Sequence, residues 1–133
     1  MNINQQSNDL SAIFGEVIYT YTRTQALADG ALVDVSETAR QAGFRIPVAL
    51  THALWNVIET IPKLTPWQDC EGRLWDVLWM AAESGRGCSS RRFVYEVILS
   101  CEGTKKQRVQ LVCECGPGDD PKPVITIGFP SDF

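Results

Sequence analysis

RFVYEVILS, residues 92–100, and QRVQLVCEC, residues 107–115, each place apolar side chains at every second position. A period of two sets one face of a β-strand against a core and turns the other toward solvent. A third strand-like run, VITIGF at 124–129, follows the turn sequence GPGDDPKP at 116–123. Strands joined in succession by turns pair antiparallel, so these segments predict a three-stranded antiparallel meander with one buried face.

Two main helices are expected to pack on this meander. The first covers 51–61, where Thr51 can cap the opening turn of HALWNVIETI and Pro62 stops the helix. The second covers 72–84, within EGRLWDVLWMAAES at 71–84. Its apolar arc is wider than the stripe of an ordinary surface helix, so it needs cover on two sides.

The wide arc of the second helix leaves open where its tryptophans point. Leu74, Leu78 and Ala81 are expected to face the meander. Trp75 and Trp79 turn either toward the other main helix or toward a partner protein. We favour burial of both rings, because burial is the commoner use of aromatic side chains. The remaining arc is left to Arg73, Asp76, Met80 and Glu83.

The N-terminal part of the domain predicts short elements. Thr22 and Gly30 are placed to cap and to end a helix, and Ser36 opens another. Pro47 offers no donor to a strand ladder, which favours the border of a sheet. We expect a strand at 16–21, a helix at 22–30, an extended run at 31–35, a helix at 36–43, and an edge strand or extended arm at 44–50.

Composition sets the limits of the fold. The chain has 133 residues, of which 44% are hydrophobic and 21% charged, as in ordinary globular domains. Residues 1–12 are rich in Asn, Gln and Ser and predict a flexible N-terminal segment. Residues 13–133 then form a single domain. Short helices and a strand before two main helices and a meander give an α+β fold class.

The same composition excludes several classes of protein. No stretch has the length and hydropathy of a membrane span, and no secretory signal opens the chain, so we expect a cytoplasmic protein without membrane contact. Five cysteines, an odd number, favour free thiols. Cys113 and Cys115 stand two apart in a strand rather than on zinc-binding turns, so neither a metal nor a cofactor is expected.

Positive charge gathers in one part of an acidic chain. Residues 86–108 carry six basic and two acidic groups, against a net charge of −4 for the whole protein. Guanidinium groups and backbone N–H groups in a Ser- and Gly-rich loop suit a phosphate or carboxylate, and nucleic acid stays open as a ligand. The candidate anion- or partner-binding residues are Arg86, Arg91, Arg92, Lys105, Lys106, Arg108 and Trp79.

Three phrases carry a resemblance to a known family. They are IYTYTRTQALADGALVDVSETARQAGFRIPVALT, DCEGRLWDVLWMA and CGPGDDPKPVITIGFP, and together they span about residues 13–130. The chain resembles an uncharacterised bacterial family, labelled only as a domain of unknown function and commonly encoded by phages, plasmids and other mobile elements. The resemblance implies a non-enzymatic binding or accessory protein, with a protein partner or an anionic ligand, and in some cases a counter-defence role.

A second resemblance is enzymatic. VIYTYTRTQALADGALVDV is similar to the opening of small ADP-ribosyltransferase-like folds, which implies an enzyme acting on a nucleotide-like substrate. Its candidate groups are Tyr19, Tyr21, Arg23 and His52. We place binding first and this enzyme second. A homo-oligomer is also open, because a second copy can cover an apolar helix or an open sheet edge.

Overall fold

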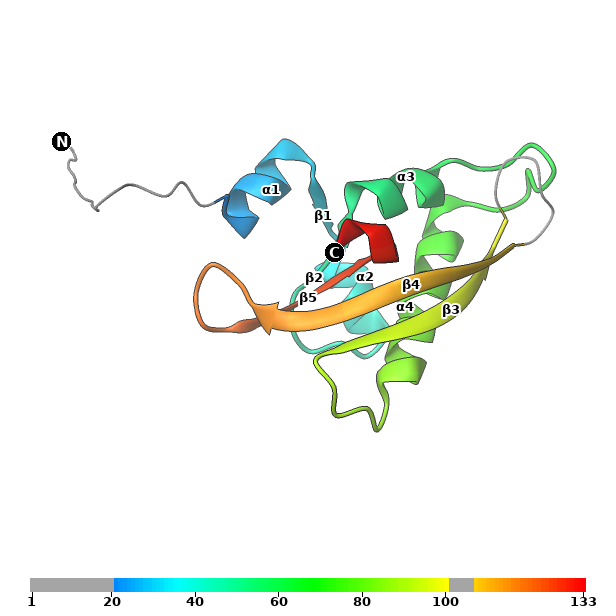
Figure 1. Ribbon diagram of the computed structural model, residues 1–133. Helices are drawn as coiled ribbons and strands as arrows, with labels where there is room; N and C mark the ends of the chain where they lie inside the picture. The colour runs from blue at the N-terminus through cyan, green and yellow to red at the C-terminus, as the bar shows by residue number, and fades with distance from the viewer. Residues whose placement is uncertain (1–20, 101–106) are drawn as a thin grey trace.

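The computed structural model describes residues 21–100 and 107–133 (Figure 1). The flexible segment expected at 1–12 lies outside these ranges, and so does the strand expected at 16–21 except for Tyr21, which is not in a strand. The elements are α1 (Arg23–Asp29), β1 (Leu32–Asp34), α2 (Ser36–Gln41), β2 (Val48–Thr51), α3 (His52–Glu59), α4 (Cys70–Gly85), β3 (Arg92–Leu99), β4 (Gln107–Pro117), β5 (Pro123–Gly128) and the short 3-10 helix η2 (Pro130–Asp132).

The strands form one open sheet in the order β1-β2-β5-β4-β3. β3, β4 and β5 pair antiparallel in succession, β5 then pairs parallel with β2, and β2 pairs antiparallel with β1. The α+β class is therefore confirmed. The expected three-stranded meander on two main helices accounts for only part of the fold, because the described residues contain a five-stranded sheet and four α-helices.

The expectation for residues 44–50 is wrong. β2 lies inside the sheet, with strands on both sides, and is neither an edge strand nor an arm. Pro47 precedes the strand, so its missing N–H removes no ladder bond. Its carbonyl accepts a hydrogen bond from the Ile125 N–H at 2.9 Å and so begins the parallel pairing.

The core lies between the sheet and helices α2, α3 and α4. Figure 1 shows α4 behind the strands and η2 in front of them. The Tyr95 hydroxyl donates to the Val77 carbonyl at 3.0 Å and ties β3 to α4. The core gathers Ala39 from α2, Leu54 and Ile58 from α3, Leu74, Val77, Leu78 and Ala81 from α4, and Val48, Leu50, Tyr95, Val97, Leu99, Leu111, Cys113 and Ile127 from the strands.

Helix α1 is held against the other face of the sheet. The Arg23 guanidinium donates to the Thr126 hydroxyl at 2.7 Å and to the Ile125 carbonyl at 2.9 Å. The Asp119 carboxylate, in the β4–β5 turn, accepts from the N–H groups of Arg23 and Thr24. The Thr24 hydroxyl also donates to this carboxylate, and its bond together with the two N–H bonds holds the pKa of Asp119 below its usual range. The turn sequence therefore anchors the first helix, a role that its composition does not reveal.

The caps expected at Thr22, Gly30 and Thr51 are confirmed, whereas α2 begins at Ser36 as expected but has Val35 at its N-cap position and no side-chain cap bond. The Thr22 side chain accepts from the Gln25 N–H, and the Gln25 side chain returns a bond to the Thr22 backbone. Gly30 ends α1 at φ 85°, a left-handed conformation that favours glycine. Thr51 caps α3 and Asp69 caps α4.

Arg73, which the sequence pattern leaves outside the apolar arc of α4, is buried in the structure. It is 3% exposed, and its guanidinium donates to the carbonyls of Ile58 at 3.0 Å and Val57 at 2.8 Å, and to the Gln68 side chain at 2.7 Å. The last carbonyls of a helix have no partner within the helix. Arg73 satisfies two of them and joins α3 to α4.

Replacing Arg73 tests this joint. Arg73→Leu leaves the carbonyls of Val57 and Ile58 without their donor, and buried polar groups without partners are costly. We expect the free energy of unfolding in urea to fall by about 3 kcal/mol. Arg92→Gln is the matched control, because Arg92 forms an exposed ion pair that is worth about 1 kcal/mol or less. Equal losses in the two variants would contradict the role of Arg73.

Candidate functional site

A cleft of about 450 Å³ lies beside the C-terminal end of α4. Two of the predicted basic residues, Arg86 and Arg91, line it, and we name it the Arg86–Arg91 cleft. Its walls come from the turn after α2, the end of α4, the loop before β3 and the helix-covered face of the sheet. The other lining residues are Ala42, Gly43, Phe44, Ala81, Ala82, Gly85, Ser90, Phe93, Cys113, Cys115 and Ile125.

Charge sets this cleft apart from three other hollows of the described surface. Its lining contains two arginines and no carboxylate. Each of the others contains at least one Asp or Glu side chain. Arg86 forms an ion pair with Glu83 at 2.9 Å, but both side chains are exposed, so water screens the pair. Within residues 21–100 and 107–133, Arg91 has no ion pair.

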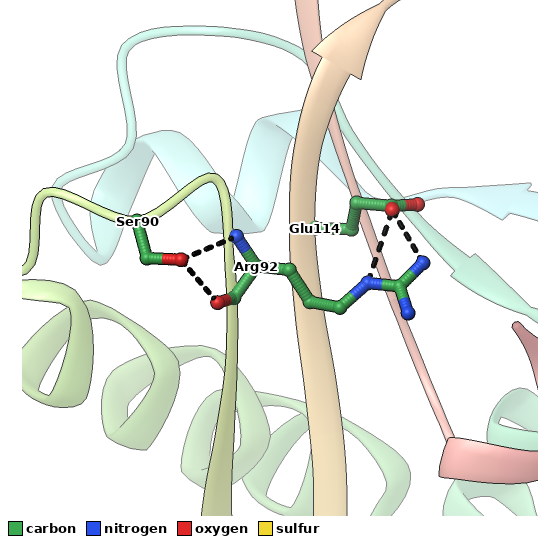
Figure 2. Close-up of polar contacts among 3 residues, drawn as sticks. All are labelled: Ser90, Arg92 and Glu114. Carbon is green, nitrogen blue, oxygen red and sulfur yellow. Dashed lines mark hydrogen bonds and ion pairs between the residues drawn. The ribbon is translucent and has the colours of Figure 1, made fainter.

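Local sequence explains how the cleft is built. A Cβ on Gly85 would lie 3.1 Å from the Phe93 ring, so glycine allows the ring to approach the helix end. The Ser90 hydroxyl accepts from the Arg92 N–H at 3.3 Å and donates to the Arg92 carbonyl at 2.7 Å (Figure 2). This double contact fixes the loop at the start of β3. Because side chains alternate along a strand, Arg91 lies at the cleft and Arg92 on the opposite face.

Two cysteine side chains form part of the apolar floor. Burial, with the nearby Cys115 and Cys88 thiols, raises the pKa of Cys113 to about 12. Its thiol is therefore neutral at ordinary pH and does not reduce the positive charge of the arginines. Cys70, Cys88, Cys113 and Cys115 are free thiols, whereas Cys101 lies outside the described residues. No cluster of His, Cys, Asp and Glu able to hold a metal ion occurs in the described ranges.

The remaining predicted basic residues do not join the cleft. The Arg92 guanidinium pairs with the Glu114 carboxylate at 2.6 Å (Figure 2). Arg108 pairs with Glu96 at 3.4 Å. By strand alternation both pairs lie on the sheet face opposite the core. Lys105 and Lys106 lie outside the described residues.

Trp79 lies in a second hollow, of about 470 Å³, between α4 and β3. Trp75 and Trp79 stack with ring centroids 5.7 Å apart. Trp75 is half-buried, but Trp79 is 43% exposed, so the expectation that both rings are buried is wrong for Trp79. The hollow, named here the Trp79 groove, is lined by Asp76, Trp79, Met80, Glu96, Val97, Ile98 and Arg108.

The structure does not bring the candidate enzyme residues together. Tyr21 and Arg23 line one hollow of about 500 Å³, but His52 is not among its lining residues. The Tyr21 hydroxyl donates to Asp29 at 2.8 Å, and Arg23 holds α1 to the sheet. His52 approaches the Asn56 side chain at 3.5 Å. Tyr19 lies outside the described residues.

Sequence reasoning missed all of the cleft wall except Arg86 and Arg91. Alternation in β3 and β4 sets Phe93, Cys113 and Cys115 on one face and could have identified them as neighbours. Gly43, with φ 111°, belongs to the turn after α2 and is far from them in sequence. No local signal places that turn beside β4, because its position depends on the pairing of β2 with β5.

The comparisons with known proteins add a family but no activity. In the described part of the chain, every helix is too short or too polar to cross a bilayer. No curated protein and no solved structure matches the sequence. The model of a family of unknown function, DUF6573, matches residues 10–133, and its description mentions neither phages nor plasmids. Since this match covers nearly the whole chain, the protein belongs to DUF6573, a family of unknown function.

Proposed function

We propose that the protein is a non-enzymatic binding protein and that its Arg86–Arg91 cleft takes a small ligand with an anionic group and an apolar body. The observation that carries this proposal is the pair of arginines over an apolar floor without a lining carboxylate. Guanidinium groups recognise carboxylates and phosphates through two parallel hydrogen bonds. A volume of about 450 Å³ is within the range of small-molecule sites.

The partial negative charges of two helix C-termini oppose an anion in the cleft. They have to be compared with the positive charges of the two arginines. α2 and α4 both end at the cleft, and a helix C-terminus carries a partial charge of roughly −0.5. Carbonyls at the end of α2 are already satisfied, because Gly43 N–H donates to Arg40 and Phe44 N–H donates to Ala39. Glu83 compensates Arg86, so Arg91 supplies the guanidinium charge that has no ion pair among the described residues. At the end of α4 the Arg86 N–H donates to Glu83 and the Cys88 N–H donates to Gly85, so the opposing partial charges of both helix ends are reduced.

The chemistry of the lining supports binding rather than catalysis. A cysteine nucleophile acts as the thiolate, whereas Cys113 has a pKa of about 12. A nucleophile also needs a base within hydrogen-bond reach, and the chain's single histidine, His52, does not line the cleft. The ADP-ribosyltransferase-like alternative has less support, because its candidate residues are divided between separate places.

The biological setting is a further part of this proposal. The resemblance of the sequence to proteins of phages and plasmids supports an accessory role in a mobile element, including counter-defence. Small acidic proteins of mobile elements often act by binding, and by this analogy a ligand cleft and exposed aromatic surface support the role. A protein partner therefore stands beside the anionic ligand in the proposal.

A fluorescent anion tests the cleft. Anilinonaphthalene sulfonate combines an aromatic body with a sulfonate, and we expect its fluorescence titration to show one saturable site. Arg91→Gln should weaken its binding about tenfold, because a charge-assisted hydrogen bond is lost. Ala82→Leu should also weaken it by filling the cleft. Arg108→Gln is the control, since Arg108 is also exposed but lies at the Trp79 groove. Loss of binding in that control, with Arg91→Gln unchanged, would refute the proposed site.

Alkylation tests the assignment of the cysteines as neutral lining. Cys88 is exposed, whereas Cys113 is buried and its pKa is about 12. With iodoacetamide at neutral pH, we expect Cys88 to react first and Cys113 to stay unmodified until the protein is unfolded. Peptide mass spectrometry over a time course gives the order. Rapid modification of Cys113 in the folded protein would indicate an activated thiol and would favour an enzyme.

A further inference from the structure

β3 is the last strand of the sheet and has no strand beyond it among the described residues. The Cys115 N–H donates to the Arg91 carbonyl at 2.7 Å, which makes Arg91 and Cys115 a hydrogen-bonded pair. Along an antiparallel strand, residues whose N–H and C=O groups bond to the neighbouring strand alternate with residues whose N–H and C=O groups point away from it. The odd-numbered residues of β3 therefore bond to β4, and the main-chain groups of Arg92, Val94, Glu96 and Ile98 point out of the sheet.

The Ser90 hydroxyl closes one end of this outer edge. It bonds to both outward groups of Arg92, the N–H and the carbonyl (Figure 2). The outward groups that remain for another strand are those of Val94, Glu96 and Ile98. This set is symmetric about Glu96. An antiparallel strand with the same three residues could therefore pair each outward N–H with an outward carbonyl of β3, and each outward carbonyl with an N–H.

We infer that a second copy of the chain pairs with this edge, β3 against β3 and antiparallel, about a two-fold axis at Glu96. Val94 of one copy then lies opposite Ile98 of the other, and each Glu96 lies opposite its equivalent. The three residues of each copy exchange main-chain hydrogen bonds across the axis without displacing Ser90. Edge strands with free N–H and C=O groups are templates for such pairing.

The side chains beside the edge fit an occupant of this kind. Val94 is 57% exposed and Ile98 is 55% exposed, and the pairing covers both with each other. On the helix side, Trp79 and Met80 are exposed in a groove that includes Ile98. The second copy presents the same apolar groups beside the axis. Apolar surface is thus covered on both sides of the joined sheets.

The unfavourable contact is the central pair of carboxylates. Like charges directly opposite each other destabilise a strand pair. Arg108 lies 3.4 Å from Glu96 in each copy, so two guanidinium groups flank the two carboxylates. Each of these ion pairs is exposed and worth about 1 kcal/mol or less, so it offsets only part of the repulsion between the two carboxylates that face each other directly. Replacing Glu96 with glutamine should therefore strengthen the pairing. An arrangement in which Glu96 forms a favourable ion pair with the second copy predicts the opposite.

Sedimentation velocity of the full chain over a range of concentrations measures the pairing. We expect a monomer–dimer equilibrium for the natural protein, a monomer for Ile98→Lys, and for Glu96→Gln a dissociation constant lower by roughly two- to fivefold. Leu64→Lys is the matched control, because Leu64 is 53% exposed and lies outside β3. Circular dichroism shows that each variant is folded, and Val94→Lys replaces Ile98→Lys if the latter unfolds.

Amide hydrogen exchange of the natural protein reads the main-chain contacts directly. The N–H groups of Val94, Glu96 and Ile98 should become protected as the concentration rises. A monomer at every concentration, a dimer that persists in both lysine variants, or outward N–H groups that stay unprotected in the dimer would each overturn the inference. A weaker dimer in Glu96→Gln would overturn the proposed register.

Discussion

The parallel pairing of β2 with β5 is the contact on which the rest of this structure depends. It joins segments far apart in the sequence, with Val48 opposite Ile125 and Leu50 opposite Ile127. Val48, Leu50 and Ile127 are completely buried. The pairing also carries the turn after α2 to the side of β4, where Gly43 and Phe44 face residues of the C-terminal strands. Without it, the Arg86–Arg91 cleft would lose one wall.

The parallel pairing also constrains the path of the chain between β2 and β5. Parallel strands need a crossover connection, and here the chain from β2 to β5 includes α3, α4 and the β3–β4 hairpin. Both helices pack on the same face of the sheet and must meet each other there. The Arg73 guanidinium joins them by bonding to carbonyls at the end of α3. A charged group is tolerated in this core because its donors have fixed acceptors.

Short-range patterns in the sequence predicted the structural features that depend only on residues close by in the chain. The caps at Thr22 and Thr51 and the buried alternate positions of β3 follow from the sequence within a few positions. The internal place of β2 and the burial of Arg73 do not, because both depend on partners distant in the sequence. The site was predictable to the same degree. Arg86 and Arg91 were candidates from composition, but alternation already separates Arg91 from Arg92, a step that charge counting ignores.

The two proposed surfaces use different parts of one short segment and do not compete. Ser90 lines the Arg86–Arg91 cleft, and its hydroxyl also occupies the outward main-chain groups of Arg92. The outward main-chain groups that are open to a second copy begin at Val94. Pairing about Glu96 therefore leaves the loop before β3 in place. Arg91 stays available at the cleft, while Arg92 is held by Glu114 on the opposite face. A ligand and a second copy can therefore be bound at the same time.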